Sequence, residues 1–259
     1  MAEGFPVKKA EAYHGSKEEK PLAEEVLDLL NLSLEEIRER IPALAERVAE
    51  LRRKSRADEL TGLLNRSGFR EEVQQFEAVF ARERRAKRVE IPTALLAIDL
   101  DGFKEVNDTG GHACGDRCLQ LIAEHVKSAL RESDLFARVG GDEFSIFLSE
   151  SNEEGALEVA RKVRAVLEGV VTDTIRLEFP SYKGKLSASI GVVVAESDQA
   201  VTGKDRMGAI DEAMRQADYA AYVVKAAGKQ GELTLGGAKE ADAGGNFQRD
   251  FLEGKTLPR

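Results

Sequence analysis

The sequence has little cysteine, no long apolar run and no excess of positive charge, and each shortage excludes a class of protein. Its two cysteines, Cys114 and Cys118, are too few for a disulfide framework. No stretch approaches the roughly 18 apolar residues of a membrane span, and the N-terminus lacks the hydrophobic stretch of a secretory signal. Acidic side chains outnumber basic ones by 47 to 38, which argues against binding a nucleic-acid backbone. We therefore expect a soluble cytoplasmic protein with no nucleic-acid polymer as partner.

The composition that remains is enough for a folded core, because 42% of the 259 residues are hydrophobic. The length allows one substantial domain with additional segments. Four parts are expected: a mobile tail at 1–20, a helical segment at 21–57 with a possible dimerising or regulatory role, a main domain at 58–235 and a flexible Gly-, Ala- and charge-rich tail at 236–259.

The segment 21–57 predicts two helices. Apolar residues at helical spacing indicate the first helix over 22–32, and Ser33 followed by Glu36 is a capping box that predicts the start of the second. Pro42 predicts a kink or a fresh helix start. The apolar residues of the second helix alternate at spacings of three and four, as in a coiled-coil seam: Leu34, Ile37, Ile41, Leu44, Val48 and Leu51. Two interpretations remain open, a helix lying on its own domain and a helix that dimerises.

The main domain alternates between strand and helix patterns and predicts one α/β domain. A nearly continuous apolar run, Thr93–Ile98, predicts a buried central strand that ends at Asp99. Strand-like segments flank Gly140-Gly141, which predicts a β-hairpin whose turn uses positive φ at glycine. Further elements are expected as helices at about 115–130, 156–167 and 207–227 and as strands at 135–139, 144–148 and 186–194.

Three carboxylates are placed to meet at one edge of the predicted sheet. Asp99 ends the buried strand, while Asp142 and Glu143 occupy the tip of the hairpin. Carboxylates brought together repel unless a cation lies between them, and oxygen ligands suit a hard ion such as Mg²⁺. Paired Mg²⁺ ions are a recurring device for displacement at phosphorus.

The surrounding motifs resemble the GGDEF family of diguanylate cyclases. Around Asp99 the sequence reads Asp-Leu-Asp-Gly-Phe-Lys, and 140–144 reads Gly-Gly-Asp-Glu-Phe. The segment 58–66 (Asp-Glu-Leu-Thr-Gly-Leu-Leu-Asn-Arg) is similar to the opening signature of the family, and 217–229 is similar to its closing helix. The resemblance implies an α/β (α+β) fold with a central mixed sheet flanked by helices, as in the palm of nucleotidyl cyclases, plus an N-terminal helical extension.

The resemblance also implies an activity and a set of site residues. Family members condense two GTP into cyclic di-GMP and two pyrophosphates, as dimers with Mg²⁺, for which Mn²⁺ can substitute. Asp142 would either assist deprotonation of the attacking hydroxyl or bind the second metal ion, and Glu143 would share the catalytic role. The implied metal ligands are Asp99, Leu100, Asp142 and Glu143. The implied substrate contacts are Phe103, Lys104, Asn107, Asp116, Gly140, Gly141, Lys225 and Lys229.

Two of these residues would read the base. Asn107 and Asp116 correspond to the guanine-reading pair of the family, and a carboxylate suits guanine because its N1–H and N2–H₂ are both donors. Without the family, Asn107 reads as a turn residue and Asp116 as the N-cap of the next helix. Arg131 and Asp134 match the RxxD site where product inhibits the enzyme, and Arg161-Lys162 occupies the place comparable to that of a supporting arginine, with Lys162 assigned to the site.

Other functions remain open at this level. A catalytically silent receptor could bind cyclic di-GMP through Arg131 and Asp134, but the acidic turn and Asp99 are retained. A cyclase that accepts adenine nucleotides is disfavoured by Asp116.

Overall fold

The computed structural model describes residues 34–87, 92–195, 206–228 and 231–242. The chain divides into two units, 1–51 and 52–259. The helices are α2 (Leu34–Arg56), α3 (Arg66–Lys87), α4 (Phe103–Gly110), α5 (His112–Ala129), α6 (Glu153–Val166), α7 (Thr172–Glu178), α8 (Arg206–Ala226) and α9 (Leu235–Ala241), with a π-helical turn, η1 (Leu167–Val171), between α6 and α7. The strands are β1 (Thr93–Asp101), β2 (Leu135–Arg138), β3 (Glu143–Leu148), β4 (Ser187–Ala195) and β5 (Gly231–Thr234).

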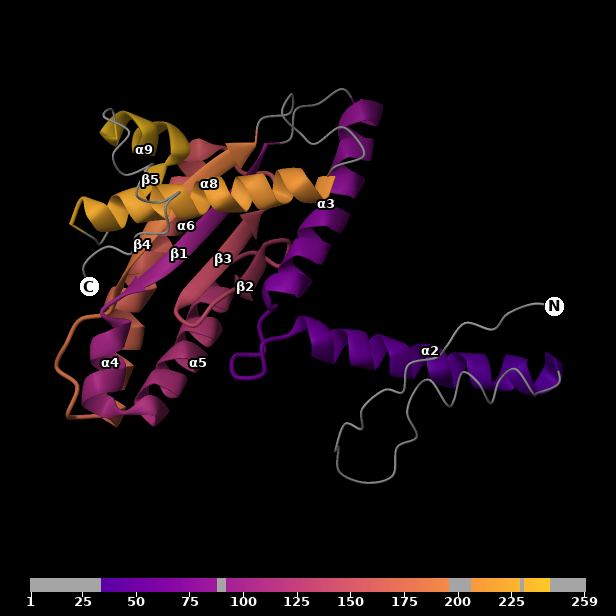
Figure 1. The fold of residues 1–259 in the computed structure, drawn as a ribbon, viewed down its shortest axis with the longest axis horizontal. Helices are drawn as coiled ribbons and strands as arrows, with labels where there is room; N and C mark the ends of the chain where they lie inside the picture. Colours follow the sequence, from indigo (N-terminus) through magenta and orange to yellow (C-terminus); the bar gives the residue numbers. More distant parts are fainter. Residues whose placement is uncertain (1–33, 88–91, 196–205, 229–230, 243–259) are drawn as a thin grey trace, which may run out of the picture. The chain divides into compact units, whose positions relative to one another are not determined.

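The five strands form one mixed sheet in the order β2-β3-β1-β4-β5 (Figure 1). Strand β1 lies at the centre and pairs antiparallel with both β3 and β4, while β5 joins β4 in parallel. The central position explains the apolar composition of β1, because helices cover both faces of the sheet. The predicted mixed sheet flanked by helices is therefore confirmed.

Alternate residues of β1 supply two separate cores. Leu96, Ile98 and Leu100 pack with α5 and α6 on one face. Leu95 and Ala97 pack with α3 and α8 on the other. Asp99 lies on the same face of β1 as Leu95 and Ala97, so its side chain points to the face covered by α8. A helix on this face is therefore placed to contact the Asp99 carboxylate.

Several predicted elements differ from the observed ones. Helix α2 continues through Pro42 without a fresh start, since losing one backbone donor does not end a helix of 23 residues. Helix α3 was not predicted. Much of α9 was assigned to the C-terminal tail, yet Ala238 is fully buried and Tyr219 donates a hydrogen bond to Asp242 at 2.9 Å. The helix predicted at 22–32 and the remainder of both tails lie outside the described residues.

Among the described residues, no helix has both the length and the apolar character needed to cross a bilayer. Both cysteines are buried on α5.

The contact between β4 and α8 depends on the absence of a side chain at Gly191. A Cβ there would lie 2.0 Å from the Ala217 carbonyl oxygen and 2.4 Å from the Ala221 nitrogen, both backbone atoms of α8. We expect Gly191→Ala to lower the free energy of unfolding by about 1–3 kcal/mol, because the helix must move away from the sheet. Urea denaturation measures this effect. Gly169→Ala is the matched control, since a Cβ at Gly169 meets nothing within 4 Å, and equal stability of the two variants would contradict the packing explanation.

Candidate active site

The strand register places Asp99 beside Glu143. These two residues are Cα partners at the end of the β1–β3 ladder, and the Leu100 backbone N–H donates to the Asp142 carbonyl at 3.2 Å. Three of the four predicted metal-site residues are therefore adjacent through backbone pairing alone, and Asp142 joins them through the turn. The Leu100 side chain is buried in the core, so only its backbone is available to the site.

The glycines of the turn between β2 and β3 do not serve the purpose predicted for them. Neither Gly140 nor Gly141 has a positive φ, so the predicted turn conformation is wrong. Space decides instead: a Cβ at Gly140 would lie 2.3 Å from the Glu143 carboxylate oxygen Oε2, whereas one at Gly141 meets nothing within 4 Å. Gly140 thus lets the Glu143 side chain fold back over the turn.

Arg138 holds this turn in place. Its Nε and Nη2 donate to the Gly141 carbonyl at 3.1 and 2.8 Å, and its Nη1 donates to both carboxylate oxygens of Asp58 at 3.2 Å. Burial acts to raise the pKa of Asp58, but hydrogen bonds from the Thr61 hydroxyl and N–H, together with the Arg138 guanidinium, keep it below its usual range. Sequence reasoning gave neither residue a role. The sequence signal for this contact is Arg138 itself, because a charged side chain inside a short strand requires a polar partner.

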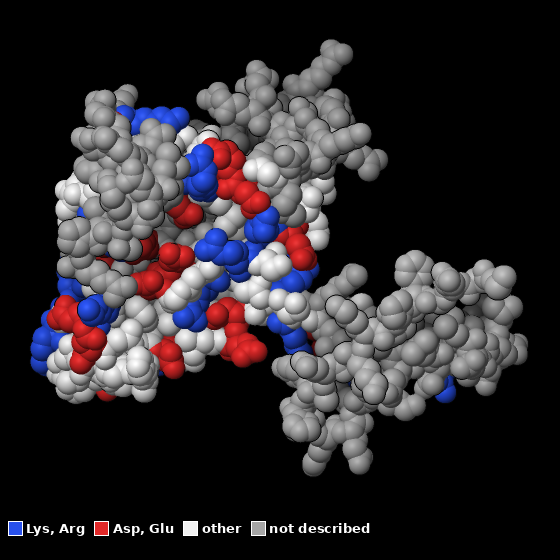
Figure 2. All heavy atoms as spheres, viewed as in Figure 1, with Lys and Arg blue, Asp and Glu red and all other residues white. Residues whose placement is uncertain are grey.

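The two carboxylates at the end of the β1–β3 ladder, Asp99 and Glu143, each form an ion pair with a basic side chain from a helix. Lys225 of α8 donates to Asp99 Oδ1, and both side chains are about one-quarter to one-third exposed. Arg66 Nη2 lies 3.5 Å from Glu143 Oε2, and the Arg66 Nε donates to the Val139 carbonyl at 3.0 Å. Burial raises the pKa of Asp99 despite the opposing effect of Lys225. Figure 2 shows basic and acidic side chains interspersed on the face it presents.

Asp218 of α8 is a further carboxylate near this pair. Its side chain is exposed, yet the surrounding protein displaces enough water from the carboxylate, and Glu143 and Asp99 add enough repulsion, to raise its pKa to about 6. Arg66 opposes this shift. The sequence motif contains Asp218, but its helical position alone did not indicate that it would lie near the hairpin.

Asn107 and Asp116 lie at the corner between α4 and α5. A Cβ on Gly115 would come within 2.1 Å of the Asn107 side-chain oxygen, so the missing side chain lets Asn107 lie against α5 immediately before Asp116. Asp116 is exposed and is not an N-cap, because α5 begins at His112 with Gly111 as its cap. The N-cap interpretation is therefore wrong, and Asp116 has no such structural task to compete with reading a base.

The remaining predicted substrate residues divide between the described and undescribed parts. Lys104 is exposed in the first turn of α4, and Phe103 packs against the main core. Lys229 lies outside the described residues. Lys225, predicted to contact phosphate, instead contacts Asp99.

The donor set is of a kind that could hold a divalent cation only together with further ligands. Asp99, Glu143 and the backbone at Leu100 supply hard oxygen ligands of the kind Mg²⁺ prefers. Within the described ranges, no three His, Cys, Asp or Glu side chains gather closely enough to hold a metal ion by themselves. Water molecules or phosphate oxygens would complete the coordination.

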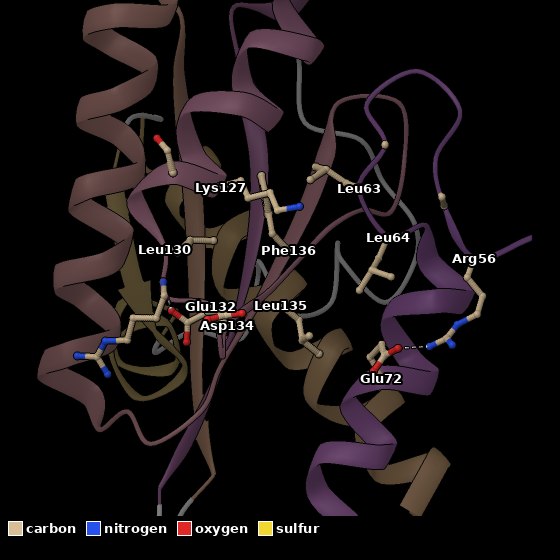
Figure 3. Close-up of a pocket in the computed structure, with 14 residues that line it drawn as sticks. Arg56, Leu63, Leu64, Glu72, Lys127, Leu130, Glu132, Asp134, Leu135 and Phe136 are labelled. Atoms are coloured by element: carbon tan, nitrogen blue, oxygen red, sulfur yellow. Dashed lines mark hydrogen bonds and ion pairs between the residues drawn. The ribbon is translucent and has the colours of Figure 1, made fainter. Parts of the chain in front are cut away.

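Two of the three predicted inhibitory residues, Arg131 and Asp134, lie in a turn elsewhere on this unit. The Arg131 N–H donates to Asp134 Oδ2 and the Asp134 N–H donates to the Arg131 carbonyl, both at 3.0 Å. This turn borders a pocket of about 700 Å³ that also reaches Arg56 and Phe136 (Figure 3). Lys162 is exposed on α6 and pairs with Glu158 at 2.7 Å.

The close fit of Gly140 against Glu143 allows a prediction. Gly140→Ala should lower any metal-dependent activity of this site about 10²-fold, because the Glu143 carboxylate must move by an ångström or more. Initial rates measure the effect, and thermal denaturation checks that the fold persists. Wild-type rates in this variant would show that the Glu143 rotamer is unimportant.

Comparison with known proteins identifies the family to which the chain is similar. The family described as diguanylate cyclase, GGDEF domain, matches residues 55–229. The chain is 31% identical over 172 residues to the probable diguanylate cyclase DgcT of Escherichia coli, covering 66% of this chain and 34% of that protein. It is 33% identical over 184 residues to the cyclic di-GMP phosphodiesterase NbdA of Pseudomonas aeruginosa, covering 70% of this chain and 21% of that protein. The chain thus spans about a third or less of these relatives.

A solved structure is also similar. A microbial GGDEF domain, studied for its interaction with cyclic di-GMP, superposes with a TM-score of 0.55 at 28% identity, covering 71% of this chain and 99% of that one. With the strand register that brings Asp99 to the acidic hairpin, these matches show that the chain belongs to the GGDEF-domain family of diguanylate cyclases.

Proposed function

We propose that this protein is an Mg²⁺-dependent diguanylate cyclase that condenses two GTP into cyclic di-GMP and releases two pyrophosphates. The observation that carries the proposal is the pairing of Asp99 with Glu143 beside the glycine turn. An inactive relative would be expected to lose one of these carboxylates, and this chain retains both. The relative from Escherichia coli, whose name is probable diguanylate cyclase, supports the same activity.

In this mechanism each protomer binds one GTP at the hairpin. Asp99, Glu143 and the Leu100 carbonyl would hold Mg²⁺, which, when bound, offsets negative charge on the phosphates; Mn²⁺ would substitute. Of the two turn glycines predicted to contact substrate, Gly140 is covered by the Glu143 side chain, whereas Gly141 leaves space for phosphate close to the backbone. Lys104, Lys225 and Lys229 offset further charge. Asp142 takes the proton of the attacking 3′-hydroxyl or contributes to the second metal site.

Guanine selection would depend on the corner between α4 and α5. The Asp116 carboxylate accepts hydrogen bonds from guanine N1–H and N2–H₂, and Asn107 lies beside it against Gly115. Adenine presents an acceptor at N1, so the same carboxylate would repel it.

Two GTP-loaded sites must face each other for the phosphodiester bonds to close, so the active form would be a homodimer. Helix α2 is the proposed dimerisation element. Ile41 and Leu51 lie on its predicted seam and are 51% and 45% exposed, which leaves apolar surface for a second copy.

Product would inhibit the enzyme at the Arg131 turn. The Arg131 side chain is exposed and offers a planar fork to phosphate or to a guanine edge. Lys162 is a weaker substitute for a second arginine, because its single ammonium cannot form the bidentate contact and already pairs with Glu158.

Arg131→Ala should therefore relieve product inhibition. We expect the cyclic di-GMP concentration that halves the rate to rise at least about 10-fold, since a charge-assisted bidentate contact is lost. The measurement is the initial rate of pyrophosphate release against added cyclic di-GMP. Glu132→Ala serves as a control from the same turn, and the same inhibition curve for all three proteins would remove the turn from the regulatory scheme.

The nucleotide product tests the proposed function. The purified chain is incubated with Mg²⁺ and GTP, ATP or an equimolar mixture, and the products are separated by chromatography and identified by mass. We expect cyclic di-GMP in the GTP and mixed samples and no cyclic product from ATP alone. A folded dimer that forms no cyclic product would refute the cyclase, and a mixed or adenine product would refute the role of Asp116.

A further inference from the structure

Both proposed metal carboxylates are already paired with cations of the protein. Lys225 reaches Asp99 from α8, and Arg66 reaches Glu143 from the start of α3. The paired residues are 126 and 77 positions apart in sequence, so the contacts depend on the tertiary fold and not on local helix geometry.

The Lys225–Asp99 pair is the stronger of the two. The two side chains are in direct hydrogen-bond contact, and both are about 70% covered by protein. A partly buried pair is screened less by water than an exposed one. Arg66 and Glu143 are both more than half exposed and 3.5 Å apart, so their attraction is weaker.

An ammonium at Asp99 competes with a divalent cation for the same oxygen. Lys225 also repels an approaching metal ion through its own charge. With Asp99 compensated in this way, the protein alone presents a poor ligand set, since within the described ranges no three acidic, His or Cys side chains cluster closely enough to hold an ion.

Nucleotide binding supplies an alternative partner for the basic side chains that pair with Asp99 and Glu143. The triphosphate of GTP brings negative charge to the hairpin, and Lys225 on a flexible four-carbon stem can turn from Asp99 to a phosphate oxygen. Arg66 also attracts the nearby Asp218 carboxylate, since its charge opposes the rise in the pKa of Asp218. Both carboxylates can then lose their resident cations without leaving a charge unpaired.

We propose that Lys225, assisted by Arg66, acts as a resident counter-ion that keeps the metal carboxylates compensated until a nucleoside triphosphate draws it away. The inference rests on the proposed function, because it assigns Asp99 and Glu143 to the metal site. Its consequence is that the free protein binds divalent cations weakly, and that metal and nucleotide bind interdependently. Lys225 is thereby a positioning residue for the metal site as well as a phosphate contact.

The test measures binding of Mn²⁺ alone, in the absence of nucleotide, from the loss of its free-ion electron paramagnetic resonance signal. We expect Lys225→Gln to bind Mn²⁺ at least about 10-fold more tightly than the wild type, because one unit of competing charge is removed next to Asp99. Lys225→Arg should stay as weak as the wild type, because the positive charge is kept. Lys104→Gln is the matched control, since it removes an exposed lysine that is also assigned to the triphosphate.

Three results would overturn the proposal: no tightening in Lys225→Gln, equal tightening in Lys225→Arg, or equal tightening in Lys104→Gln. The wild type is assayed for cyclic di-GMP in parallel. Product formation without tightening in Lys225→Gln would reject the counter-ion role and leave the cyclase standing. Tightening without any product from the wild type would reject the cyclase and keep the competition between Lys225 and the metal.

Discussion

Glu143→Gln should abolish detectable cyclase turnover, with a loss of about 10³-fold or more. Glutamine keeps the size of the side chain and its place beside Asp99 at the end of the β1–β3 ladder, but it removes the charge that a metal ion requires. The initial rate of cyclic di-GMP formation at saturating GTP and Mg²⁺ measures the effect. Asp99→Asn should give a similar loss.

The same variant should fold normally. The ion pair that Glu143 makes with Arg66 is 3.5 Å long, with both side chains about half exposed, and such pairs contribute only about 0–1 kcal/mol. Thermal denaturation should therefore show little change. A Glu143→Gln protein with more than a tenth of the wild-type rate would remove Glu143 from the metal site.

The second large effect should come from charges on the seam of α2. Replacing Ile41, Leu44 and Val48 together by glutamate removes three apolar side chains, each contributing about 1.5–3 kcal/mol when buried. Even a loss of about 4 kcal/mol, which is below the sum of these contributions, raises the dimer Kd about 10³-fold. Because the proposed reaction needs two facing sites, the rate per protomer at nanomolar protein should fall by at least about 10²-fold and recover partly at high concentration.

A matched control separates the seam from a general effect of charge. Ala43 and Ala49 are exposed positions of α2 outside the spacing of the seam. The double variant Ala43→Glu with Ala49→Glu therefore adds charge to the helix without changing a seam residue. Analytical ultracentrifugation reports the dimer, and the rate is followed against protein concentration. If the seam variant keeps the wild-type rate at every concentration, α2 does not hold the active dimer.

Local patterns predicted most of the sheet and the edge where the site lies. The apolar run of β1 ending at Asp99 and the hairpin around the glycine pair were both readable, because strand burial and turns leave short-range signals. Helix α3 was missed, since charged residues interrupt its apolar face. The short α9 was missed because its Gly- and Ala-rich sequence is typical of a tail, and its burial against α8 depends on a contact with Tyr219.

Which residues form the site was easier to predict from the sequence than which of them contact one another. Lys225 was expected at phosphate, but its contact with Asp99 joins residues 126 positions apart and follows from the packing of α8 on β4. The clamp of Arg138 on Asp58 spans 80 residues. The requirement for glycine at 140 came from the Glu143 side chain and not from the backbone conformation. Each of these depends on tertiary positions that spacing alone does not supply.

The most direct test of the proposed chemistry is the stoichiometry of the reaction with GTP and Mg²⁺. Wild-type protein should consume two GTP and release two pyrophosphates for each cyclic di-GMP formed, and Glu143→Gln should form none. Pyrophosphate release without a cyclic product, or equal product from both proteins, would contradict the assignment of this hairpin as a diguanylate cyclase site.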